Sequence, residues 1–189
     1  MTWTLPNILT VLRLLAAPGV ALMFLYFHRP WADWFALTLF IGAAITDWFD
    51  GYLARRWEQS TPLGAFLDPV ADKLMVAVAL VMLVEEHASF WLTLPAVIII
   101  GREIVVSALR EWMAELGARA QVAVSRLAKW KTAAQMVALV ILLANPPTFT
   151  LWVLIGYALL IIAAVLTLWS MVQYLLAAWP HLRITSEKK

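Results

Sequence analysis

The chain has 189 residues, of which 63% are hydrophobic and 14% are charged. Soluble domains carry roughly 25% charged residues, so much of this apolar surface must face lipid. The many aliphatic and aromatic residues exclude a disordered chain, and the absence of cysteine excludes disulfide bonds and zinc sites built on thiolates. The net charge of +2 gives no indication of nucleic-acid binding.

Six apolar segments are candidates for membrane-spanning helices, which need about 20 mostly apolar residues. In chain order they cover residues 8–27, 31–54, 64–84, 90–109, 129–144 and 149–178. Thr61 and Pro62 form a helix N-cap and a first-turn proline, which places the start of the third helix near them. Residues 110–131 are predicted to form an amphipathic helix on the membrane surface.

The sequence thus predicts an all-α integral membrane protein with six transmembrane helices. One membrane domain covers residues 1–182, and a polar, frayed tail covers residues 183–189. Basic residues gather on one side of this topology: Arg55 and Arg56 follow the second segment, further ones lie between 110 and 131, and others lie in the tail, whereas the opposite side has only Arg29. Because Lys and Arg are enriched in cytoplasmic loops, both termini are predicted to be cytoplasmic.

Four aspartates occupy the predicted cytoplasmic ends of the second and third segments. Asp47 and Asp50 are three residues apart, and Asp68 and Asp72 are four apart, so each pair shares one face of its helix. A short loop joins the two helices, which we expect to be antiparallel neighbours. The four carboxylates are therefore expected to converge on one small volume.

This carboxylate cluster is costly at a membrane, because each charge near the bilayer centre costs at least about 2.5 kcal/mol and like charges repel. Bound cations would remove both costs. Oxygen ligands at this density suit a hard divalent ion, so the sequence predicts Mg²⁺ or Mn²⁺, with room for two ions. The competing interpretation is that the aspartates cap helix ends or pair with Arg55, Arg56 and Lys73.

Small residues and one arginine accompany the aspartates. Gly51, Ala54 and Gly64 leave room for the close approach of a bulky ligand or another helix. Arg55 lies one turn after Gly51 and can offer a forked donor to phosphate oxygens. The combination indicates a metal-assisted site for a phosphate-bearing substrate.

Together these residues resemble a family signature. The motif of the CDP-alcohol phosphotransferases is filled at every fixed position by Asp47-x-x-Asp50-Gly51-x-x-Ala54-Arg55 and, after eight residues, by Gly64-x-x-x-Asp68-x-x-x-Asp72. Residues 6–13 and stretches between 101 and 136 are similar to the bacterial members whose acceptor is glycerol 3-phosphate. The resemblance implies a multi-pass, homodimeric enzyme of the bacterial cytoplasmic membrane, with its active site on the cytoplasmic side.

The implied reaction transfers the phosphatidyl group of CDP-diacylglycerol to sn-glycerol 3-phosphate and releases CMP. The resemblance makes Asp47, Asp50, Asp68 and Asp72 the metal ligands, and we predict that Asp72 is also the general base. It assigns CDP binding to Asn7, Thr10, Arg13, Asp47, Gly51, Ala54, Arg55, Gly64 and Asp68. The candidates for the acceptor phosphate are Arg102, Arg110, Arg126, Lys129 and Lys131.

Several alternatives stay open at this point. Arg102 could instead form a buried ion pair with Glu103, and Lys129 and Lys131 could extend toward lipid headgroups. The acceptor could be inositol phosphate, phosphatidylglycerol or serine, although the basic residues favour an anionic one. A cation transporter with the aspartates as its ion site and a non-catalytic membrane scaffold are the rivals from other classes.

Overall fold

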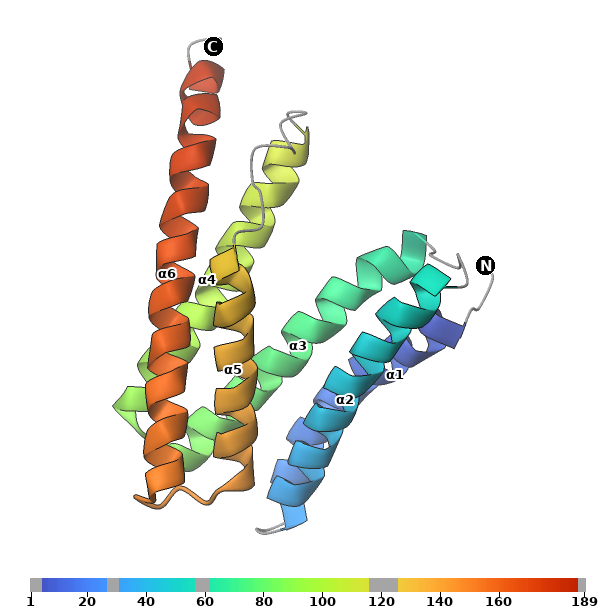
Figure 1. Cartoon of the computed structure of the whole chain (residues 1–189), viewed down its shortest axis with the longest axis vertical. Coiled ribbons are helices and arrows are strands. Elements are labelled where there is room, and N and C mark those ends of the chain that lie inside the picture. Colours follow the sequence, from blue (N-terminus) through green and yellow to red (C-terminus); the bar gives the residue numbers. More distant parts are fainter. Residues whose placement is uncertain (1–4, 27–30, 57–61, 116–125, 187–189) are drawn as a thin grey trace. The chain divides into compact units, whose positions relative to one another are not determined.

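The computed structural model describes residues 5–26, 31–56, 62–115 and 126–186, and all regular structure in those ranges is helical. The described residues form the helices α1 (Leu5–Tyr26), α2 (Trp31–Arg56), α3 (Pro62–His87), α4 (Phe90–Glu115), α5 (Arg126–Ala144) and α6 (Leu151–Ser186), which are labelled in Figure 1. Each predicted apolar segment falls on one of these helices. The prediction that the third helix starts near Pro62 is confirmed.

Two helix ends differ from the prediction. α4 continues past residue 109 to Glu115, so the start of the predicted surface helix belongs to α4, and residues 116–125 lie outside the described ranges. α6 continues to Ser186, so the helix extends into the stretch from Arg183 that was predicted as a polar tail. Helical hydrogen bonding does not depend on apolar side chains, and Arg, Glu and Leu favour helix, so both helices extend beyond their apolar parts.

Two of the described helices are long and apolar enough to cross a membrane: α4, and the part of α6 from Leu151 to Trp179. Shorter apolar helices cover Asn7–Met23 in α1 and Trp130–Ala144 in α5. In α2 and α3, charged side chains such as Asp47, Asp68 and Asp72 interrupt the apolar run. The all-helical fold is therefore confirmed, and it includes apolar helices of membrane-spanning length.

The chain divides into two compact units. Unit 1 comprises residues 1–87 and 139–153, and unit 2 comprises residues 88–138 and 154–189. Each unit contains one group of buried polar residues, so the two are described separately below.

In unit 1, α1 packs against both α2 and α3. Its buried face carries Asn7, Thr10, Arg13, Ala17 and Val20, at the three- and four-residue spacing of one helix face. α2 and α3 contact each other far less than either contacts α1. α2 and α3 contact each other, as predicted for neighbouring helices, but α1 supplies the larger packing surface for both, because apolar faces decide which helices pack along their length.

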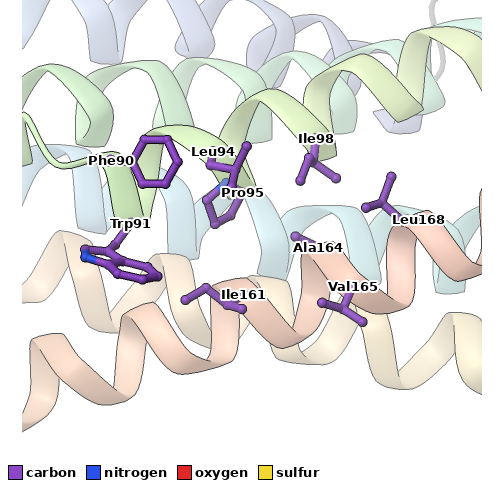
Figure 2. Close-up of a pocket in the computed structure, with 9 residues that line it drawn as sticks. All are labelled: Phe90, Trp91, Leu94, Pro95, Ile98, Ile161, Ala164, Val165 and Leu168. Atoms are coloured by element: carbon purple, nitrogen blue, oxygen red, sulfur yellow. The ribbon is translucent and has the colours of Figure 1, made fainter.

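In unit 2, α4 and α6 face each other. The buried residues of α4 include Leu92, Ala96 and Ile99, and those of α6 include Leu160 and Ala163. Figure 2 shows the apolar cavity of about 140 Å³ between these helices, which is lined by Phe90, Trp91, Leu94, Pro95, Ile98, Ile161, Ala164, Val165 and Leu168. Farther along the same two helices, the buried faces become polar.

Candidate functional site

The polar group of unit 1 begins on α1. Asn7, Thr10 and Arg13 follow one another at three-residue intervals and are 3%, 1% and 4% exposed. A buried arginine requires compensating charge and hydrogen bonds, because an unpaired buried charge is strongly unfavourable. The partners of this stripe come from α2 and α3.

Three of the predicted aspartates surround the Arg13 guanidinium. Nη1 donates hydrogen bonds to Oδ1 of Asp47 at 2.5 Å and to Oδ1 of Asp72 at 3.0 Å. Nη2 lies 3.6 Å from Oδ1 of Asp68, which also accepts a 2.6 Å hydrogen bond from the Thr10 hydroxyl. The structure therefore brings Asp47, Asp68 and Asp72 together, as predicted, and it places Arg13 and Thr10 in the same group.

The carboxylates are open to solvent, although their arginine is not. The side chains of Asp47, Asp68 and Asp72 are 43%, 45% and 52% exposed, whereas that of Arg13 is 4% exposed. Arg13 thus contacts the carboxylates from the packed side of α1 and leaves their other oxygens accessible. Such carboxylates can take further ligands without any change in the packing of α1.

Part of the predicted donor site lies outside the described side chains. Asp50, Gly51, Ala54 and Arg55 belong to α2, but only their backbone is described. Gly64 is described and is buried on α3, one turn before Asp68. The roles predicted for these residues stay predictions.

The acidic group of unit 1 offers oxygen ligands of the kind that a metal ion could bind. Among the described side chains, no set of three or more His, Asp or Glu residues is arranged to hold one metal ion, and Asp50 is not in that set. The donor chemistry nevertheless fits a hard cation, because carboxylate oxygens from two helices already converge on one positive group. The ligand prediction for Mg²⁺ or Mn²⁺ stays a prediction.

The polar group of unit 2 is centred on Arg102 of α4, which is 8% exposed. Its Nη1 donates to Oε1 of Glu103 at 2.5 Å, and its Nη2 donates to the Ser170 hydroxyl of α6 at 3.0 Å. The alternative interpretation of Arg102 as the partner of Glu103 is therefore confirmed. The guanidinium keeps one unused donor, because its Nε is buried without a hydrogen-bond partner among the described residues.

Two further basic residues join this cluster. Arg110 Nη2 donates a 2.7 Å hydrogen bond to the Tyr174 hydroxyl, and Nζ of Lys131, a residue 6% exposed on α5, lies 3.7 Å from Oε1 of Glu103. The structure therefore brings together three of the five predicted phosphate-binding residues. The other two, Arg126 and Lys129, belong to α5, but their side chains are not described.

The sequence analysis assigned no site residue to α6, so its contribution was missed. Thr167, Ser170 and Tyr174 are all buried and follow one another at three- and four-residue spacing on one face of that helix. The available signal was this polar stripe in a segment without charged residues. It was overlooked because no carboxylate or basic residue draws attention to it.

Comparisons with known proteins now bear on both clusters. The family model of CDP-alcohol phosphatidyltransferases matches residues 3–169, a range that contains Thr10, Arg13, the four aspartates and the basic residues of α4 and α5. The chain belongs to the CDP-alcohol phosphatidyltransferase family. Membership of this family confirms the resemblance inferred from the aspartate motif.

Curated relatives cover nearly the whole chain. A CDP-diacylglycerol–glycerol-3-phosphate 3-phosphatidyltransferase of Pseudomonas fluorescens is 66% identical over 186 residues, which are 98% of this chain and 95% of the relative. Proteins of the same name from Shigella flexneri and Escherichia coli K12 are each 56% identical over 179 residues, or 94% of this chain and 96% of theirs. This CDP-alcohol phosphatidyltransferase is therefore similar along nearly its full length to enzymes whose names give glycerol 3-phosphate as the acceptor.

Proposed function

We propose that this chain transfers the phosphatidyl group of CDP-diacylglycerol to sn-glycerol 3-phosphate, which yields phosphatidylglycerophosphate and CMP. Family membership and the names of the relatives support the reaction. The structural observation that supports an acceptor with a phosphate group is the buried basic cluster, in which Arg102, Arg110 and Lys131 accompany the single carboxylate of Glu103, whereas the names of the relatives specify glycerol 3-phosphate. A cluster with excess positive charge suits a phosphate-bearing acceptor and has no role for a zwitterion such as serine.

The donor binds at the polar group of unit 1. Asp47, Asp50, Asp68 and Asp72 would hold Mg²⁺ or Mn²⁺, with ligands enough for two ions. A metal bound there would supply positive charge to offset the diphosphate of the donor and the departing CMP. Asn7, Thr10, Gly51, Ala54, Arg55 and Gly64 bind the cytidine and diphosphate, and Arg13 keeps three of the carboxylates turned toward one another.

Asp72 acts as the general base. Its side chain is the most exposed of the three that contact Arg13, at 52%, so an acceptor hydroxyl can reach it. The carboxylate takes the hydroxyl proton while the hydroxyl oxygen attacks the phosphorus that carries diacylglycerol. The bond between that phosphorus and the CMP oxygen breaks, and CMP leaves with the electron pair.

Arg102, Arg110 and Lys131, assisted by Arg126 and Lys129, bind the phosphate of the acceptor. Forked guanidinium donors suit this task, because they can bind two phosphate oxygens at once. Arg102 and Arg110 are eight residues apart on α4, close to two helical turns, and both contact Tyr174.

The enzyme acts in the bacterial cytoplasmic membrane as a homodimer with six membrane-spanning helices. The apolar length of α4 and α6 supports membrane insertion. The lopsided distribution of Lys and Arg supports cytoplasmic termini and a cytoplasmic active site. This orientation gives the site access to soluble glycerol 3-phosphate.

The test is CMP release by the purified full-length chain in detergent. CDP-diacylglycerol is supplied with Mg²⁺ or Mn²⁺, and glycerol 3-phosphate, inositol phosphate, serine and phosphatidylglycerol are offered in parallel. Metal-dependent release with glycerol 3-phosphate alone is expected. Release with another acceptor would contradict the acceptor assignment but not the family, whereas metal flux into vesicles without CMP release would favour transport.

A further inference from the structure

Tyr174 of α6 occupies an unusual position between two like charges. The Cζ atom of Arg110 lies 5.1 Å from the centroid of its ring, and the Cζ atom of Arg102 lies 5.9 Å from it. An aromatic face attracts a guanidinium within about 6 Å, so one ring offsets part of the repulsion between two arginines. The side chain is buried, with 9% of the residue exposed.

The hydroxyl of Tyr174 can still donate a hydrogen bond. It accepts its 2.7 Å hydrogen bond from Arg110 Nη2, and this leaves its own proton unused. The part of the chain that the structure describes offers no acceptor for that proton. Because a phenol both accepts and donates, Tyr174 can hold Arg110 and donate to a third group at the same time.

Ser170, one turn earlier on α6, fixes the other arginine. Its hydroxyl donates to the carbonyl oxygen of Thr167 at 3.0 Å, so its lone pair is turned toward Arg102 Nη2. Arg102 is thereby held by Glu103 on one side and by Ser170 on the other. Its buried Nε–H has no acceptor among the described residues.

A buried donor without an acceptor, the Nε–H of Arg102, therefore lies in a cluster of excess positive charge, where the Tyr174 hydroxyl can also donate. Because a buried donor without an acceptor is destabilising, an arrangement of this kind is best explained by an anionic ligand that accepts from both groups. A phosphate monoester offers several acceptor oxygens and a charge of opposite sign. A neutral alcohol offers neither in sufficient number.

We propose that Tyr174 completes the phosphate site of the acceptor, a proposal that rests on the proposed function. Its ring positions Arg102 and Arg110, its hydroxyl donates a hydrogen bond to the phosphate, and Ser170 acts as a positioning residue for Arg102. The polar face of α6 thus selects acceptors that carry a phosphate monoester. The apolar remainder of the helix has no part in that selection.

Tyr174→Phe is the decisive variant, because it keeps the ring and removes only the hydroxyl. We expect the KM for glycerol 3-phosphate to rise about ten-fold, the KM for CDP-diacylglycerol to stay unchanged, and kcat at saturating acceptor to stay within about two-fold. Tyr174→Leu also removes the ring and should raise the acceptor KM further. Tyr157→Phe removes the same hydroxyl from α6 at a distance of roughly 25 Å along the helix and should change neither constant.

Calorimetric titration of inorganic phosphate into the purified chain, without donor lipid, separates this proposal from the proposed function. Weaker phosphate binding by Tyr174→Phe but not by Tyr157→Phe would support it even if glycerol 3-phosphate released no CMP. Unchanged phosphate affinity and unchanged acceptor KM in Tyr174→Phe would overturn it. A lower melting temperature with both constants unchanged would likewise overturn it, since Tyr174 would then serve stability alone.

Discussion

Among the side chains that the structure describes, each unit buries one arginine, and the surroundings of the two are opposite in charge. Arg13 in unit 1 contacts the carboxylates of Asp47, Asp68 and Asp72, so that group has a formal charge of −2. Arg102 in unit 2 shares Glu103 with Lys131 and shares Tyr174 with Arg110, so that group has a formal charge of +2. In neither group do the positive and negative formal charges cancel.

The difference teaches what each cluster can bind. A group with surplus carboxylate is stabilised by a further cation, whereas a group with surplus guanidinium and ammonium is stabilised by an anion. Exposure agrees with this reading, because the carboxylates of unit 1 are about half exposed while their arginine is buried. The same residue type therefore organises an acidic group in one unit and a basic group in the other.

Removal of divalent metal should have the largest effect. Treatment with a chelator is expected to abolish CMP release, because the surplus carboxylates of unit 1 then have no cation to bind the diphosphate. The binding of inorganic phosphate, which depends on unit 2, should be unchanged by the same treatment. Full activity after complete metal removal would contradict the prediction that the acidic group of unit 1 acts through a bound cation.

Asp72→Asn should come next, with a fall in kcat of about a hundred-fold or more. The amide keeps the size of the side chain but cannot accept the proton of the acceptor hydroxyl. Steady-state kinetics, together with a melting temperature close to that of the wild type, would separate this effect from unfolding. Near-normal turnover would remove Asp72 as the base.

Arg110→Ala should raise the KM for glycerol 3-phosphate by roughly ten-fold to a hundred-fold, because a hydrogen bond to a charged group contributes about 1.5–3 kcal/mol. The KM for CDP-diacylglycerol should change little. Glu111→Ala, which alters the neighbouring exposed residue of α4, serves as the matched control. The reverse pattern of KM values would place Arg110 at the donor.

The smallest expected effect concerns stability and compares the two arginines directly. Arg13→Met leaves three carboxylates without their shared cation, whereas Arg102→Met relieves repulsion from Arg110 and Lys131. We expect the first variant to be less stable than the second by about 1 kcal/mol in the absence of metal. Addition of Mg²⁺ should narrow that gap, as measured by thermal unfolding in detergent; a gap of the opposite sign would contradict the charge argument.

The helices were predictable because composition and proline breaks mark them strongly. All six predicted segments coincide with helices, and errors are confined to ends such as those of α4 and α6. The helix ends escaped prediction because polar residues with good helix propensity continue a helix into water. The larger packing of α2 and α3 against α1 was not predicted, because apolar faces rather than order along the chain decide which helices pack along their length.

The part of the site that consists of charged residues was predictable from the sequence. The aspartate pairs and the arginines of α4 stand out in apolar segments, and the structure brings most of them together. Tyr174 and Ser170 were not predicted as site residues because polar uncharged residues are common in apolar helices. Their spacing becomes meaningful only when Arg102 and Arg110 are seen on the facing helix.

By itself, the sequence determined the membrane-like composition, the six helices and the pairing of aspartates along each helix face. Those properties follow from chain periodicity, which is local. Only the tertiary structure decided that Arg13 contacts three carboxylates and that the polar face of α6 holds the arginines of α4. Periodicity specifies which residues share a face of one helix, but tertiary packing decides which faces contact each other. Those contacts determine the net charge of each cluster.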